Sequence, residues 1–92
     1  MASLPRRERW SVLAAILRSL DAHIRDYGEN ARVTRVAISA NVPYDRLMAY
    51  LKELARAGLV TEERMPRLTV KGKDFLAHYQ QWAEVLSRFG LT

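Results

Sequence analysis

The side chains best suited to chemistry in this sequence are basic residues that recur through its second half. Arg46 and Lys52 lie in the segment Tyr44 to Ala57, and Arg64 and Arg67 follow a short apolar run. A guanidinium can form two hydrogen bonds to guanine or contact a phosphate, and an ammonium suits a phosphate. The full set predicted to contact DNA is Arg35, Tyr44, Arg46, Ala49, Lys52, Arg64, Arg67, Lys71 and Lys73.

The overall charge agrees with a polyanionic partner. The 92 residues carry 15 Lys and Arg against 10 Asp and Glu, a formal net charge of +5 at pH 7. Such a balance favours nucleic acid, and it also serves solubility in many small proteins. Asp45 and Glu53 lie on or beside the same predicted face and would repel phosphate. Asp45 also suits the positive end of its helix.

Residues for other kinds of chemistry are scarce. The chain has no cysteine, and His23 and His78 are too far apart for the ligand spacing of a zinc site. It has no nucleophile elbow and no glycine-rich phosphate loop. We therefore predict a binding protein and not an enzyme, without catalytic residues, metal, cofactor or small-molecule substrate.

The N-terminal sequence and the apolar runs indicate the expected location. The first residues lack the apolar stretch of a signal peptide. The longest apolar run, Val12 to Leu17, is far shorter than the about 20 residues that span a bilayer. We expect a cytoplasmic, nucleoid-associated protein with no membrane partner.

The elements that must position the basic residues begin with a long amphipathic helix. Pro5 suits the first turn of a helix, and Gly28 suits the position after its end. Apolar residues recur between them at intervals of three and four, which places them on one face. They are Trp10, Leu13, Leu17, Leu20, Ile24 and Tyr27.

A short helix, a tight turn and a longer helix follow. Thr34 is the predicted N-cap of the short helix, and Asn41 to Pro43 ends it because the residue before proline disfavours the α region. The longer helix runs from Tyr44 to Ala57, with Gly58 after its end. This order is typical of a helix-turn-helix, whose second helix enters the major groove of DNA. The predicted shared core is Ala37, Ile38, Val42, Leu47 and Leu51.

The residues after the longer helix predict a β-hairpin. Leu59–Glu62 and Arg67–Thr69 are its expected strands, Met65-Pro66 is its turn, and Ala31–Val33 could add a rung. A hairpin in this position is a wing, and one this short favours a contact to phosphate. The predicted fold class is mainly α (α+β), a winged helix-turn-helix with a long C-terminal dimerisation helix.

Thr69 should cap that last helix and Gly90 should stop it. Its apolar stripe has the spacing of a coiled coil and consists of Phe75, Tyr79, Trp82, Leu86 and Phe89. The stripe either pairs with that of a second copy or folds back on Trp10, Leu13 and Leu17 of the first helix. We expect a winged domain over residues 1–76 and an extension of the last helix over residues 77–92.

The segment from Asn41 to Val60 and the later L-T-V-K-G-K-D-F-L-A-H-Y resemble the archaeal 10a-type winged-helix proteins over roughly residues 8 to 82. The matching residues are Tyr44, Leu47, Tyr50, Leu51, Leu54, Gly58, Leu59, Leu68, Thr69, Gly72, Phe75 and Leu76. The resemblance implies a homodimer that binds double-stranded DNA, as a transcription regulator or a chromatin-associated protein. It also implies an antiparallel coiled coil through the last helix. The residues expected at that interface are Tyr79, Trp82, Ala83, Leu86 and Phe89.

The acidic residues near the predicted face leave a second hypothesis open. They are Asp45, Glu53, Glu62 and Glu63. With them, the same domain could serve as an adaptor that binds a protein and not DNA.

Overall fold

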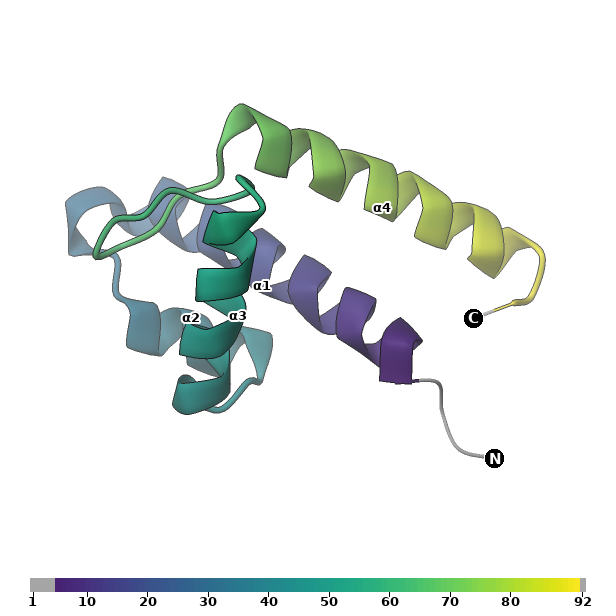
Figure 1. The fold of residues 1–92 in the computed structure, drawn as a ribbon. Helices are drawn as coiled ribbons and strands as arrows, with labels where there is room; N and C mark the ends of the chain where they lie inside the picture. Colours follow the sequence, from purple (N-terminus) through teal and green to yellow (C-terminus); the bar gives the residue numbers. More distant parts are fainter. Residues whose placement is uncertain (1–4, 92) are drawn as a thin grey trace.

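The computed structural model describes residues 5–91, and the side chains of residues 9–91. The elements in chain order are α1 (Pro5–Tyr27), the 3-10 helix η1 (Gly28–Asn30), α2 (Val33–Ala40), α3 (Tyr44–Arg56) and α4 (Val70–Arg88). Figure 1 shows α2 and α3 packed beside one part of α1, while α4 runs across α1 toward the C-terminus. The predicted bounds of the long helices are confirmed.

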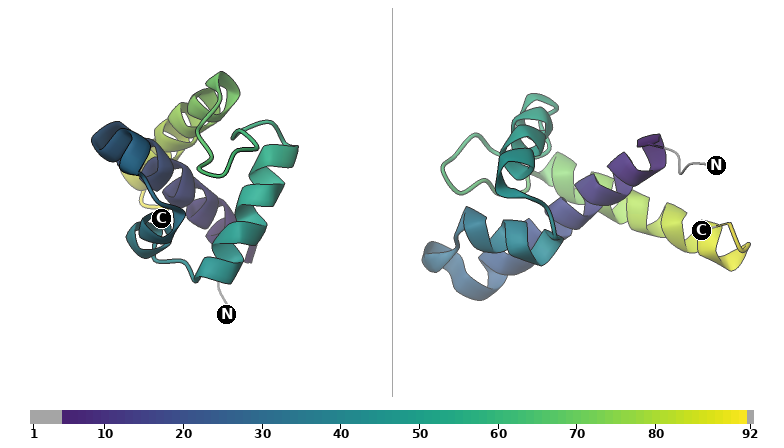
Figure 2. Two further views of the ribbon diagram at one scale, coloured as in Figure 1. Left: turned by 90° about the vertical axis from the view of Figure 1, so that its left-hand side faces the viewer. Right: turned by 90° about the horizontal axis from the view of Figure 1, so that it is seen from below.

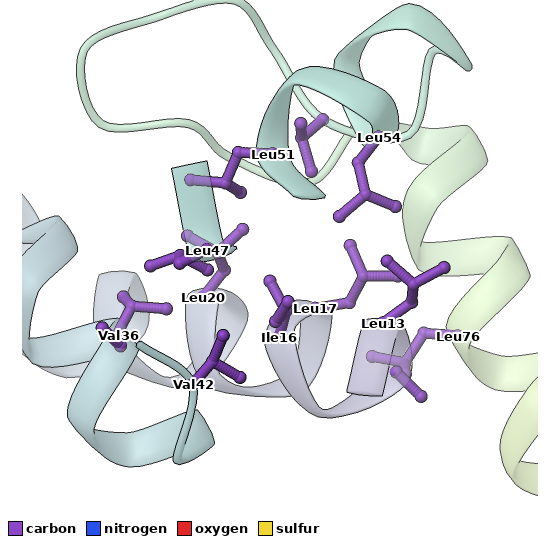
Figure 3. Packing of buried hydrophobic residues seen from close by; sticks show 13 residues of the cluster. Leu13, Ile16, Leu17, Leu20, Val36, Val42, Leu47, Leu51, Leu54 and Leu76 are labelled. Carbon is purple, nitrogen blue, oxygen red and sulfur yellow. The ribbon is translucent and has the colours of Figure 1, made fainter. Parts of the chain in front are cut away.

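The core forms around one face of α1. Ile16, Leu17 and Leu20 have no exposed surface there, and side chains from the other helices converge on them (Figure 3). Each fully buried side chain of this size stabilises the fold by about 1.5–3 kcal/mol. The buried apolar residues are Leu13, Ala14, Ile16, Leu17, Leu20, Val36, Ala37, Val42, Leu47, Leu51, Leu54, Val60 and Leu76.

The predicted stripe of the first helix is correct at its centre and wrong at its ends. Leu13, Leu17 and Leu20 are buried, but Trp10 is 42% and Tyr27 is 53% exposed. Among the described side chains of α1, the buried ones all lie in its middle turns, from Leu13 to Leu20. Ile16, outside the predicted stripe, is fully buried because helices lie against α1 on two sides (Figure 2).

The turn between α2 and α3 is set by its backbone. Asn41 adopts the left-handed conformation, with φ of 58° and ψ of 47°. The amide of Val42 donates to the carbonyl of Ala37 at 2.9 Å, and the amide of Asn41 donates to that of Ile38 at 3.1 Å. These bonds satisfy carbonyls that the end of a helix leaves free. The chain then enters α3 through Pro43.

Three expectations for the short helix are wrong. Thr34 is not the N-cap, because α2 already begins at Val33 and Arg32 occupies the cap. Ala31–Val33 adds no strand, since the amide of Arg32 donates to Nε2 of His23 at 3.1 Å and Val33 is helical. Ile38 is not in the core and is 78% exposed. Val36 and Ala37 take the buried face of α2, and Ile38 lies on the opposite side.

The predicted β-hairpin is reduced to a single antiparallel bridge between Val60 and Leu68 among the described residues. The amide of Thr61 donates to the carbonyl of Arg67 at 2.8 Å, and the amide of Thr69 donates to that of Leu59 at 3.0 Å. The amide of Arg67 donates to the side-chain hydroxyl of Thr61 at 3.0 Å and not to a carbonyl of the opposite segment, so the ladder does not continue on that side. It forms a loop, called the 59–69 loop below, whose two ends lie side by side.

Thr69 and Gly72 join this loop to the last helix. The hydroxyl of Thr69 donates to the carbonyl of Gly58 at 2.7 Å and accepts from the amide of Gly72 at 3.0 Å. The predicted Thr69 cap is therefore confirmed. Gly72 is buried, and a side chain there would overlap the backbone carbonyl of Leu59. The start of α4 thus lies directly against the end of the Gly58 turn.

The apolar stripe of α4 divides into two parts. Phe75 and Tyr79 are partly buried and pack against the core of the same chain. Ala83 and Leu86 are half-buried, whereas Trp82 is 58% and Phe89 is 73% exposed. Figure 2 shows the C-terminal end of α4, in yellow, projecting away from α2 and α3. The first part of the stripe, Phe75 and Tyr79, therefore belongs to the domain core.

The contact at Gly72 predicts whether an alanine at this position raises or lowers the free energy of unfolding. Alanine is favoured over glycine inside a helix by about 1 kcal/mol, so helix propensity alone would make Gly72→Ala stabilising. Overlap with the Leu59 carbonyl should instead lower the free energy of unfolding by about 1–3 kcal/mol. Urea denaturation followed by circular dichroism measures the difference, and a more stable variant would contradict the close approach.

Candidate nucleic-acid interface

The helix α3 presents one face to the core and the opposite face to solvent. Leu47, Leu51 and Leu54 are buried, and residues about half a turn away from them are exposed. The exposed face carries Asp45, Ala49, Lys52 and Arg56. Tyr44 in the first turn is half-exposed. This face is the one that a helix-turn-helix offers to a DNA groove.

A groove of about 470 Å³ separates this face from the 59–69 loop. Asp45, Ala49 and Lys52 line it from α3, and Glu62 and Arg64 line it from the loop. The structure thus brings together three of the predicted contact residues, Ala49, Lys52 and Arg64. Neither Lys52 nor Arg64 has a hydrogen bond or ion pair to another residue of the described chain, so both cations are available to a ligand.

The other predicted contact residues lie outside this groove. Arg46 is exposed on the flank of α3 turned away from the loop, and Arg35 is exposed in the first turn of α2. Lys73 is exposed near the start of α4. Arg46, Arg35 and Lys73 also have no partner among the described residues. A broad duplex could reach several of them, but no single pocket gathers them.

Two of the predicted cations are already engaged within the chain. Arg67 pairs with Glu63 at 3.1 Å between Nη2 and Oε2. The ammonium of Lys71 donates to the carbonyl of Ala57 at 2.9 Å, at the C-terminal end of α3. A cation there satisfies a free carbonyl and complements the negative end of the helix dipole. The sequence pattern predicts a phosphate contact for Lys71, but its position in the structure is that of a helix cap.

The acidic residues beside the face are also partly neutralised. Glu53 forms an ion pair with Arg9 of α1, and Glu63 forms the pair with Arg67. Exposed pairs of this kind contribute little to stability, because solvent screens them. Their effect is on the local charge: two of the four carboxylates that would repel phosphate carry a cation beside them. The carboxylates of Asp45 and Glu62 have no ion-pair partner within the described part of the chain.

Sequence reasoning missed two features of this surface. Met48 is 40% exposed and lines the groove beside Ala49, although its apolar character suggests a core position. Ile38 and Tyr44 line a second groove, of about 560 Å³, at the turn between α2 and α3. The angular position of Met48, away from the leucine face of α3, is the signal that finds it.

Two other kinds of site find no support among the described residues. Within residues 5–91, no helix has both the length and the apolar character needed to cross a bilayer. The same residues hold no group of three or more acidic or histidine side chains placed to bind a metal ion.

The arrangement of α2, α3 and the 59–69 loop defines a helix-turn-helix protein. A family model described as a winged helix-turn-helix matches residues 6–87. The chain therefore belongs to the winged helix-turn-helix family, a fold whose usual role is DNA binding and not catalysis. Neither the curated proteins nor the solved structures gave a significant match.

Because Lys71 caps α3 and Lys73 does not, replacing each of them should affect stability differently. Lys71→Ala should lower the free energy of unfolding by about 0.3–1 kcal/mol, because the last turn of α3 loses its cation. Lys73→Ala removes the same charge from an exposed position without a partner in the described chain and should change stability less. Urea titrations of the two variants side by side make the comparison, and equal effects would contradict the cap role.

Proposed function

We propose that this protein is a regulator-like winged helix-turn-helix that binds double-stranded DNA as a homodimer. The observation that carries the proposal is the groove between α3 and the 59–69 loop, where Lys52 and Arg64 face one space without partners in the described chain. In this proposal α3 enters the major groove and the loop acts as a wing on the phosphate backbone. Arg46 and Arg56 extend the positive surface along α3.

The release of counterions from DNA is the physical basis of the test. Each phosphate neutralised by a cation releases counterions, so affinity falls as salt rises, and log affinity is linear in log salt. A duplex on this surface should therefore show a steep negative slope. Glu53 is paired with Arg9, and Glu63 is paired with Arg67. These ion pairs support the proposal, because they lower the repulsion between the two carboxylates and phosphate.

The first experiment uses Lys52→Ala with Arg64→Ala in one chain. Binding to duplex DNA should weaken, and the salt slope should become shallower by about one unit for each phosphate that the variant no longer neutralises. The matched control is Arg18→Ala with Arg25→Ala, which removes the same charge from a groove between α1, α2 and α4. Fluorescence anisotropy across a salt series measures both.

Three results of that experiment would count against the proposal. They are a wild-type protein that binds no duplex at low salt, a flat slope, and equal decreases in affinity in the two double variants. Binding to a protein partner that persists when Lys52 and Arg64 are replaced would instead favour the adaptor hypothesis.

The exposed end of α4 supports the homodimer. Trp82 and Phe89 lie on one side of the helix beyond the core, and a monomer leaves both in water. A second copy could cover them in a symmetric contact, which is the commonest oligomer arrangement. The likeness to the archaeal 10a-type proteins points the same way. Tyr79 is expected only at the edge of this contact, because it already packs on its own core.

Replacing Trp82 tests the dimer. Trp82→Asp places a charge in the proposed contact and should convert a dimer into a monomer in sedimentation equilibrium. Ile38→Asp is the control, because Ile38 is also exposed but lies on α2. A dimer that survives Trp82→Asp, or a wild-type monomer, would show that the stripe has another role.

A further inference from the structure

Asp45 occupies an unusual place for a carboxylate on a surface that meets DNA. It lies in the first turn of α3, is exposed, and lines the groove opposite the 59–69 loop. The carboxylates of Glu53 and Glu63 are each paired with an arginine. No hydrogen bond or ion pair joins Asp45 to any residue within the described part of the chain. Its acceptor oxygens are therefore free to meet a donor on a ligand.

A free carboxylate costs affinity when it faces phosphates. Two unit charges 4 Å apart interact by about 1 kcal/mol in water, and by more where protein excludes solvent. The positive end of the α3 dipole offsets part of this repulsion. A favourable contact requires a hydrogen-bond donor on the DNA, and the donors in the major groove are the amino groups of cytosine and adenine.

The surroundings of those donors distinguish the two bases. Adenine presents its acceptor N7 beside the amino group, which would repel a carboxylate, whereas cytosine presents its amino group without an acceptor on the same base. The place of Asp45 fits such a contact, because the first residues of a recognition helix are those that reach base edges. Ala49, one turn further on, is small and leaves room for the duplex to approach.

We propose that Asp45 is a specificity-determining residue that accepts a hydrogen bond from the amino group of cytosine in the major groove. Each α3 then selects a C·G pair at one fixed position of its half-site. This inference rests on the proposed DNA binding and adds a sequence preference to it. The Asp45 carboxylate would repel sequences that offer it no donor and would form a hydrogen bond with those that present cytosine. Both the repulsion and the hydrogen bond contribute to discrimination.

The experiment selects bound duplexes from a random pool at one salt concentration. The wild-type protein should enrich sequences that share a C·G pair at one position, with a preference of about 5- to 150-fold over the other pairs. Asp45→Asn should lose that preference and shift it toward A·T, because asparagine pairs with adenine. Asp45→Ala should lose it without gaining another.

The matched control is Asp26→Asn, the same substitution at an exposed position of α1 that does not line the groove. It should keep the C·G preference. Thermal unfolding of each variant shows whether the domain is folded. Because Asp45 is exposed, its replacement should change the unfolding temperature little.

The outcomes separate this inference from the proposed function. A wild-type protein that retains no duplex would overturn both. Retention of duplexes without a C·G position that depends on Asp45 would overturn only the present inference. A uniform rise in affinity for all duplexes in Asp45→Asn, with unchanged selected sequences, would show that Asp45 acts only by repulsion.

Discussion

The contact on which the rest of the structure depends joins the end of α3 to the start of α4. Thr69 links the carbonyl of Gly58 to the amide of Gly72, and the absence of a side chain at Gly72 allows α4 to lie against Leu59. Both ends of the 59–69 loop are thereby held at one place. The loop must turn back beside α3, and the groove follows from that constraint. The same contact sets the direction in which α4 crosses α1.

The charge that α3 and its surroundings offer to a ligand depends on which cations are already paired within the chain. Arg9 and Arg67 each pair with a glutamate and Lys71 caps a helix, so these three cations near α3 are already engaged within the chain. Of the cations left for a ligand, Lys52 and Arg64 are the two that line the groove beside α3. A surface built in this way gains less from net charge than the composition suggests and depends more on where each group lies.

The parts of the fold that could be predicted are those governed by local rules. Gly58, Thr69 and Gly90 mark helix ends because the backbone and caps of those positions depend on their own residues. Ile38, Thr34 and Lys71 could not be placed in this way. Whether Ile38 is buried depends on which side of α2 meets α1, and Lys71 reaches Ala57 only because the fold brings them together. The predicted strands are reduced to one bridge because the amide of Arg67 bonds to the Thr61 hydroxyl, a tertiary detail that the apolar pattern does not carry.

The division of α4 links the domain to its proposed assembly. Leu76 is buried in the core and ties the first turns of the helix to the domain, whereas Trp82 and Phe89 are largely exposed and are not part of the core cluster. The groove beside α3 is lined by residues of α3 and the 59–69 loop, so the proposed contact on α4 uses a different surface. The proposed dimer and the proposed base contact therefore use different surfaces: the first would set the distance between two half-sites, and the second would set the affinity of each. A rigid helix is suited to join them, because the position of one groove then fixes the position of the other.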